Sequence, residues 1–304
     1  MIEVLPIELW KKVLKYLNKS TKYSASLACS TWRNLLSNDI PRPYSIHINL
    51  DASCSACVKF VNEYSTYIAV CQCRSHHETH NNMISMILND ARDRLTELLI
   101  EDSLINKDID SYISQKTLSI ILSKCGTNLK ELQFSEVDFT HIQAWCLAFI
   151  SIFKLNRIVF KDCQFPVDSI LNESFLIRCL TKSFEHLTHI EFTNSDFISD
   201  KFGMVVAKSC IRLEYLNINE CKKMTSLTVI AFCENLQYHL KTFINIHMVN
   251  TKINCTELQR QLVNPLLHCG PSWEVNQVIL SIGFRQPTLV LKNRSSHLLI
   301  TLYV

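Results

Sequence analysis

Glycine is scarce in this chain. Its 304 residues contain only four, Gly126, Gly203, Gly270 and Gly283, and the closest pair, Gly270 and Gly283, is 13 residues apart. The G-x-G-x-x-G loop, the P-loop and the nucleophile elbow of serine hydrolases all need closely spaced glycines, because the backbone there turns sharply or approaches a ligand. The sequence therefore excludes most nucleotide-dependent and serine-hydrolase functions.

Long apolar runs and a strong net charge are also missing. No hydrophobic stretch approaches the roughly 20 residues of a membrane span. The net charge of +3 is too small to indicate a nucleic-acid or membrane partner. The apolar content of 47% and the charged content of 19% are those of an ordinary globular protein. We therefore expect neither nucleic acid nor a membrane as a partner.

Cysteine, in contrast, is abundant, with 14 residues. The first residues carry Glu3, Glu8, Lys11 and Lys12 within a helical pattern, which is unlike a signal or transit peptide. We therefore expect a reducing compartment, in which most cysteines are buried thiols rather than disulfides. The sequence predicts a cytoplasmic or nuclear protein.

The first forty residues predict three short helices. Pro6 suits a first helical turn, where its missing N–H would have no partner. An apolar stripe follows at helical spacing, and a later apolar run ends near Pro41. Three helices of this length cannot bury all of this apolar surface by themselves. The stripe must therefore either cap the rest of the chain or face another protein.

The sequence motif of this stretch resembles an F-box. The similarity covers about residues 3–40, through Leu5-Pro6-x-Glu8-Leu9, Val13-Leu14-x-Tyr16-Leu17 and Leu27-Ala28-Cys29-x-x-Trp32-Arg33-x-Leu35. The resemblance implies a three-helix domain at residues 1–40 that docks a Skp-type adaptor and, through it, a cullin–RING ubiquitin ligase. The residues it implies for adaptor binding are Leu5, Pro6, Leu9, Val13, Leu14, Leu17 and Trp32.

Residues 41–90 begin with a strand and continue with a segment rich in cysteine and histidine. Ile46, Ile48 and Leu50 alternate with polar residues, which predicts a strand. The segment at 51–90 has two interpretations. One is a zinc site built from Cys54, Cys57 and two of Cys71, Cys73, His76 and His77. The other, which we favour, is an amphipathic helix around Phe60, Val61, Tyr64 and Ile68 with chance clustering of thiols and a solvated His-rich loop. We therefore assign no metal and no cofactor.

From residue 91 a repeat of the form L-x-x-L-x-L takes over. Its copies begin at spacings of 34, 26, 32 and 26 residues, and a degraded sixth copy follows 27 residues later at Leu240-x-x-Phe243. This pattern is the signature of leucine-rich repeats. The five regular copies begin at Leu95, Leu129, Leu155, Leu187 and Leu213.

The second half of each repeat supports the same interpretation. Cys163 and Cys221 lie eight residues after the first leucine, where an Asn or Cys satisfies the backbone of the turn. Helical patterns precede the next strand, and Phe139, Phe165 and Phe197 recur at matching offsets. The chain here resembles the cysteine-containing leucine-rich repeats that commonly follow an F-box.

This resemblance implies an α/β fold: a right-handed solenoid shaped as a horseshoe, with parallel strands on the concave face and helices outside. We expect it over residues 41–264, with the Cys/His-rich segment inserted at 51–90. Residues 265–304 contain three β-rich runs, at 275–284, 288–291 and 298–304. They are terminal repeats or, as we favour, a β-rich cap that covers the last edge of the sheet.

The positions between the inward leucines point to the concave face. The first repeats offer acidic side chains there, the third basic ones and the last polar ones with one tyrosine, and Leu99, Val159 and Tyr215 are expected to be exposed and to favour binding. A partner would need a basic patch opposite the first repeats. The candidate residues for substrate binding are Glu97, Leu99, Glu101, Glu131, Gln133, Arg157, Val159, Lys161, His189, Glu191, Tyr215 and Asn217.

Together these patterns predict a non-catalytic substrate receptor of an SCF-type ubiquitin ligase. No catalytic residue is proposed, because no Cys/His or Ser/His/Asp set lies beside a strained turn, a glycine pair or an oxyanion-type helix start. The alternative is a leucine-rich scaffold or assembly factor whose first helices only cap the solenoid. A third hypothesis is a zinc-dependent interaction module centred on residues 54–80. The target protein cannot be identified from the sequence.

Overall fold

The computed structural model of the chain describes part of the first helical segment, most of the repeat region and the C-terminal strands. The described residues are 9, 12, 13, 16, 44–50, 58–61, 65–71, 75–102, 113–166, 172–235, 243–249, 251–252, 258, 273–278, 288–293 and 299–303.

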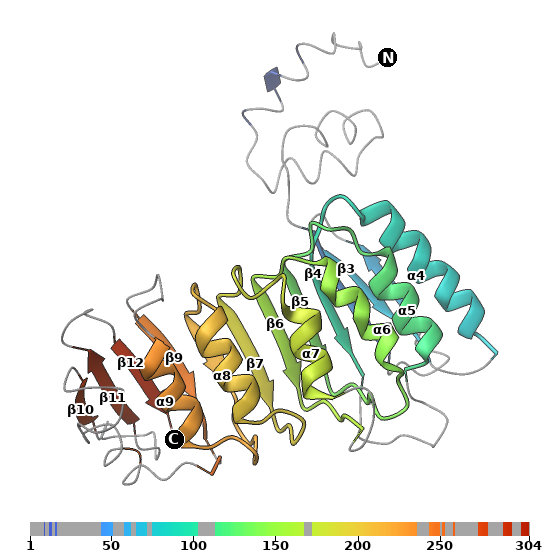
Figure 1. The fold of residues 1–304 in the computed structure, drawn as a ribbon. Coiled ribbons are helices and arrows are strands. Elements are labelled where there is room, and N and C mark those ends of the chain that lie inside the picture. Colours follow the sequence, from blue (N-terminus) through green and yellow to red (C-terminus); the bar gives the residue numbers. More distant parts are fainter. Residues whose placement is uncertain are drawn as a thin grey trace, which may run out of the picture.

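The described strands form one twelve-stranded sheet (Figure 1). Neighbouring strands pair in parallel through its long central part, and antiparallel pairs occur at the two ends, between β2 and β3 and between β10, β11 and β12. Across the sheet the strands are β10 (Trp273–Val278), β11 (Thr288–Asn293), β12 (Leu299–Tyr303), β9 (Phe243–His247), β8 (Tyr215–Asn217), β7 (His189–Thr193), β6 (Arg157–Lys161), β5 (Glu131–Ser135), β4 (Leu95–Glu101), β1 (Tyr44–Asn49), β3 (Ser65–Ala69) and β2 (Val58–Val61).

The helices lie along one face of this sheet, as Figure 1 shows. From residue 115 onward the helices connect neighbouring parallel strands, so strand, helix and next strand make one repeating unit. The helix at His77–Ala91 instead runs from β3 to β4, which lie on either side of β1. The helices are α4 (His77–Ala91), α5 (Gln115–Lys124), α6 (Ala144–Ala148) with the short 3₁₀ helix η2 (Phe149–Ile152), α7 (Glu173–Leu180), α8 (Asp200–Ser209) and α9 (Ser226–Asn235). No helix in the described part of the chain is both long and apolar enough to cross a bilayer.

The core lies between the helices and the sheet. One row of aligned positions runs through it: Leu98 pairs with Leu132, and the row continues through Ile158, Ile190 and Leu216. All five side chains are at most 2% exposed. They are the second leucine positions of the five predicted copies, so the copies form successive strands of one parallel sheet, which is compatible with a solenoid-like repeat. Its assignment to the leucine-rich repeats stays a prediction.

The turns that follow the strands also repeat. Glu136, Asp162, Asn194 and Glu220 all have positive φ angles, between 51° and 62°, and each lies seven residues after the first leucine of its copy. The next position holds Cys163 or Cys221 in two of the copies. The Cys221 thiol donates to the Phe192 carbonyl of the previous strand at 3.3 Å. The thiols of these turns therefore satisfy backbone carbonyls, as the sequence predicted.

Phenylalanines stack from one repeat to the next. Phe160 lies 5.0 Å from Phe134 and 5.0 Å from Phe192, measured between ring centroids, and both pairs are stacked. A second stack joins Phe165 to Phe139 at 5.0 Å and to Phe197 at 4.1 Å. The matching offsets found in the sequence therefore correspond to two continuous aromatic columns.

Consecutive helices are joined by hydrogen bonds at their first turns. The Glu173 carboxylate at the start of α7 accepts from the backbone N–H of Ser199 and of Phe202, at 2.6 and 3.1 Å. The Asp200 carboxylate at the start of α8 accepts from the backbone N–H of Thr225 at 2.9 Å. An acidic residue in the first turn is thus used twice: it suits the positive end of its own helix, and it holds the start of the next one.

Two expectations about secondary structure are wrong. Residues around Phe60, Val61 and Ile68 do not form an amphipathic helix: β2 and β3 form a hairpin, and β3 pairs in parallel with β1. The sixth copy of the repeat does not begin at Leu240, because Ile246 is the residue that pairs with Leu216. The aligned pattern is Phe243-x-x-Ile246-x-Met248, and the side chains of both Ile246 and Met248 are fully buried.

The strands expected after residue 265 are present. β12 pairs in parallel with β9, β11 pairs antiparallel with β12, and β10 pairs antiparallel with β11. The last described strands therefore extend the sheet without a helix between them in the residues that the structure describes. The division of the chain at residues 40 and 264 stays a prediction.

Candidate functional site

The face of the sheet opposite the helices carries the half-exposed side chains of the strands, and we call it the open face. In β4 the side chains of Leu98 and Ile100 are buried, whereas Glu97, Leu99 and Glu101 are half-buried and alternate with them. The parallel register aligns such residues into rows. One row runs Ser45, Glu97, Glu131, Arg157, His189, Tyr215 and Asn245, and the next runs His47, Leu99, Gln133, Val159, Glu191, Asn217 and His247.

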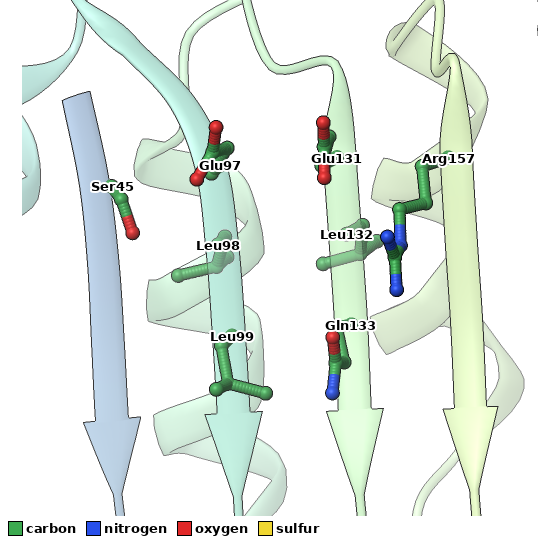
Figure 2. A pocket seen from close by; sticks show the side chains of 8 residues that line it. All are labelled: Ser45, Glu97, Leu98, Leu99, Glu131, Leu132, Gln133 and Arg157. Atoms are coloured by element: carbon green, nitrogen blue, oxygen red, sulfur yellow. The ribbon is translucent and has the colours of Figure 1, made fainter. Parts of the chain in front are cut away.

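A shallow pocket lies on the open face over β1, β4, β5 and β6 (Figure 2). Glu97 and Glu131 lie at the same level on neighbouring strands, with Leu99 and Gln133 below them, and the Arg157 side chain extends from β6 to a level between Glu131 and Gln133. Two carboxylates are therefore opposed by one guanidinium. The lining residues are Ser45, Glu97, Leu98, Leu99, Glu131, Leu132, Gln133 and Arg157.

The environment of the pocket changes the pKa of Glu97. Burial raises that pKa above its ordinary value, the neighbouring Glu131 carboxylate raises it further, and Arg157 acts in the opposite direction. A carboxylate with a raised pKa is one whose charge is poorly compensated.

A second pocket adjoins the first across Arg157. It is lined by Arg157, Val159, His189, Glu191 and Tyr215. The His189 and Tyr215 rings stack at 5.7 Å between centroids. The open face thus changes from acidic to mixed and aromatic along the repeats.

Two of the predicted binding residues, Val159 and Asn217, are buried. The expectation that Val159 is exposed is therefore wrong. Val159 is only 2% exposed, because its neighbours in the row, Gln133 and Glu191, lie on the strands to both sides. Asn217 is 8% exposed and donates from Nδ2 to the Glu191 carboxylate at 3.3 Å. Val159 can form only the floor of the pocket.

The other candidates on the open face are accessible to different degrees. Lys161 is exposed, while the remaining nine are half-buried. The structure brings them together in aligned rows, but it does not test whether they bind a target. The half-buried candidates are Glu97, Leu99, Glu101, Glu131, Gln133, Arg157, His189, Glu191 and Tyr215.

The sequence interpretation missed the part of the open face that lies on the first strands. Ser45 and His47 continue the rows of Glu97 and Leu99, and His47 Nε2 lies 2.8 Å from the Glu101 carboxylate. The signal was present, because these two residues alternate with the buried Ile46 and Ile48. The strand was predicted, but its residues were not named among the candidates for substrate binding.

The residues predicted to bind an adaptor lie mostly outside the described part of the chain. Leu9 and Val13 are described: both are helical, and their exposed fractions are 44% and 45%. Tyr16, one turn further, is 89% exposed. These three side chains are therefore accessible to solvent in the structure. Outside the described residues are Leu5, Pro6, Leu14, Leu17 and Trp32.

Only some of the predicted zinc ligands in the Cys/His-rich segment lie close to one another. Cys71 and His76 are close to each other, whereas His77 turns to helix α5, where its Nε2 lies 2.7 Å from the Ser114 hydroxyl. Burial lowers the pKa of His77, with smaller effects of Lys116 and His80, which favours the neutral ring. Cys54, Cys57 and Cys73 lie outside the described residues.

The buried thiols of the repeat are poor nucleophiles. Burial raises the pKa of Cys125 and of Cys163 to about 12 and that of Cys179 to about 11. A thiol acts as a nucleophile only as the thiolate, so these groups are almost wholly in the unreactive form near neutral pH. Their role in the described structure is packing and hydrogen bonding.

The fold and the open face are those of a repeat protein, a class that presents extended surfaces made from neighbouring units. Comparison with known protein families identifies a further domain in the chain. The family profile of the F-box domain matches residues 2–43. The chain therefore carries an F-box domain beside the repeat sheet, in agreement with the motif in its sequence. No curated protein matches the chain.

Proposed function

We propose that this chain is the substrate-recognition subunit of an SCF-type E3 ubiquitin ligase. In this proposal the F-box domain docks a Skp-type adaptor and, through it, a cullin–RING ligase. The open face of the repeat sheet holds a target protein for ubiquitination and degradation. The chain itself performs no bond chemistry; it acts by raising the effective concentration of the target near the conjugating enzyme.

The F-box match at residues 2–43 carries this proposal, and the exposure of Leu9 and Val13 supports it. The two residues lie one helical turn apart, so their side chains share one face of the helix. The competing scaffold hypothesis requires this stripe to pack against residues 41–100. Apolar side chains that remain nearly half-exposed are more consistent with a surface for a partner.

The charge of the open face supports a specific kind of target. Glu97 and Glu131 lie side by side with one nearby guanidinium, that of Arg157. A lysine or arginine of the target over these carboxylates would relieve their repulsion, and Leu99 beside them would contact its aliphatic stem. The proposed target segment is therefore basic where it meets β4 and β5.

The localisation follows from this role. A subunit that joins a cullin–RING ligase works in the cytoplasm or the nucleus, where the buried thiols also stay reduced. Neither nucleic acid nor a membrane is proposed as a partner.

The first test is direct binding of the purified full chain to a purified Skp-type adaptor, followed by capture of the cullin. We expect binding by the native chain and at least tenfold weaker binding by the Leu9→Asp/Val13→Asp variant, because two charges would be placed in an apolar contact. Met204→Asp, on the exposed side of α8, is the matched control and should bind normally. Equal binding by all three proteins, or none by the folded native chain, would refute the ligase role.

The second test concerns the target. Proteins crosslinked to the native chain in cells are compared with those crosslinked to Glu97→Lys/Glu131→Lys, with Glu185→Lys on the exposed connection before β7 as control. Loss of the same proteins from the double variant alone, with adaptor binding retained, is the expected result. Unchanged capture would remove the open face from the proposal while leaving the adaptor role intact.

A further inference from the structure

Three side chains near the start of helix α4 offer metal-ligand atoms close together. Cys71 follows strand β3, His76 is the residue before α4, and His80 lies in its first turn. Cys71 Sγ lies 3.6 Å from His76 Nδ1 and 3.9 Å from His80 Nδ1. One ligand atom from each residue lies within 4.8 Å of the other two.

The local fold explains why these residues meet. His76 and His80 are one helical turn apart, and the His80 backbone N–H donates to the His76 carbonyl at 2.9 Å, so both rings project from the same side of the helix start. Cys71 is 5% exposed and lies two residues after the buried end of β3, and its thiol is near both rings. The constellation thus joins a strand end to a helix start.

These distances match those of a shared tetrahedral ion. With Zn–S bonds of about 2.3 Å and Zn–N bonds of about 2.0 Å, a sulfur and a nitrogen on one zinc lie about 3.6 Å apart. The Cys71–His76 pair already has this separation, and the Cys71–His80 pair needs to close by only a few tenths of an ångström.

We propose that Cys71, His76 and His80 bind a zinc ion. Binding deprotonates the Cys71 thiol and releases its proton to solvent, and both histidines bind as neutral rings. His80 Nδ1 lies 3.1 Å from the Cys71 carbonyl oxygen, and coordination through this nitrogen replaces that hydrogen bond. The ion would clip the end of β3 to the start of α4, close to the end of the parallel sheet.

The ligand set differs from the one that the spacing of cysteines suggests. Cys54-x-x-Cys57 is the more familiar motif, but in the described structure the histidine that joins Cys71 and His76 is His80, and His77 is engaged with Ser114 instead. The proposed set has the spacing C-x₄-H-x₃-H. Three protein ligands leave a fourth position, which water fills.

The test uses the full chain, stripped of metal and titrated with Co²⁺ and then Zn²⁺. We expect one equivalent of Co²⁺ to give the thiolate-to-cobalt charge-transfer band and the ligand-field spectrum of a tetrahedral site, and Zn²⁺ to displace it. Cys71→Ser should abolish the charge-transfer band. His80→Gln should weaken binding about 100-fold or more, while circular dichroism verifies that each variant is folded.

Two control variants separate this site from its rivals. His186→Gln, far along the chain, should bind Co²⁺ as the native chain does. Cys54→Ser/Cys57→Ser should also retain the site in the proposed arrangement. A thiolate band that is absent from the folded native chain, that survives in Cys71→Ser, or that is lost in the Cys54/Cys57 variant would overturn the proposal. Adaptor binding is measured in parallel and is expected to be unchanged in every variant, so this result stands apart from the ligase role.

Discussion

Gly203 of helix α8 packs directly against Thr228 of helix α9. A Cβ added at Gly203 would lie 2.6 Å from Thr228 Cγ2, and Thr228 cannot turn away without breaking its hydrogen bond to the Asp200 carboxylate at 2.7 Å. Alanine favours a helix over glycine by about 1 kcal/mol, but overpacking costs about 1–3 kcal/mol. We therefore expect Gly203→Ala to lower the free energy of unfolding by about 1–2 kcal/mol, measured by urea denaturation.

The control for this prediction lies on the same helix. Met204 is 46% exposed, so Met204→Ala changes helix content without touching α9. We expect it to change stability by less than about 0.5 kcal/mol. A stabilised Gly203→Ala variant would mean that the two helices separate easily, contrary to the close contact described.

Asp200 predicts a second stability effect. Its carboxylate accepts from the backbone N–H of Thr225, from the Thr225 hydroxyl at 2.6 Å and from the Thr228 hydroxyl. Asp200→Ala leaves these donors near the start of α9 without their acceptor, which should cost about 1–3 kcal/mol by thermal or urea unfolding. Asp196→Ala, an exposed residue before the same helix, is the comparison. Equal losses in both variants would assign the effect to charge rather than to these bonds.

The aromatic columns predict a larger effect in the core. Phe160 is fully buried and contacts four other phenylalanine rings, Phe134, Phe139, Phe165 and Phe192. Phe160→Ala should lower the free energy of unfolding by about 3–5 kcal/mol, because it removes buried apolar surface and leaves a cavity. Phe160→Leu should lose clearly less. Similar losses in the two variants would show that the ring stacking adds nothing to the apolar volume.

The pKa of Glu97 predicts a pH dependence. Burial, and then the Glu131 carboxylate, raise it, so the folded chain holds this proton more tightly than the unfolded chain does. The contribution of Glu97 is therefore most favourable at acidic pH, below its unfolded pKa, and is lost as pH rises through the folded pKa. Glu97→Gln should gain stability relative to the native chain from weakly acidic to neutral pH, in unfolding curves recorded across that range.

The exposed Glu185 provides the reference for this pH series. Glu185→Gln should follow the native curve at every pH. If Glu97→Gln instead loses stability at neutral pH, then attraction to Arg157 outweighs burial and the repulsion from Glu131, and the pocket is better balanced than proposed.

The fold could be predicted where a short stretch of sequence determines the structure, and could not where pairing between distant strands determines it. The strands at Leu98, Leu132 and Ile158 were predicted because each copy carries its own inward pattern within a few residues. The hairpin of β2 and β3 was not, since Phe60, Val61, Tyr64 and Ile68 also fit helical spacing and only pairing with β1 decides between them. The sixth copy was displaced by three residues because Leu240 mimics the first leucine of a repeat.

The candidate sites divide in the same way. The rows of the open face followed from the strand period, but the burial of Val159 depends on neighbouring strands that are about 30 residues away in sequence. The Cys71 cluster was suspected from composition. His80 was not selected as a ligand, although its place one helical turn after His76 was a usable signal. Contacts between repeats decide these cases, and a single copy of the repeat does not contain them.

The spacing of the strands determines which residues of an extended peptide, lying across the open face, can contact the same row of side chains. Neighbouring strands lie about 4.8 Å apart and an extended peptide advances about 3.3 Å per residue, so three residues span about two strands. Side chains on one side of such a peptide recur every second residue, and the two periods coincide after six residues and four strands. A peptide residue placed over Glu97 on β4 would thus be in phase with one placed six positions later over Tyr215 on β8.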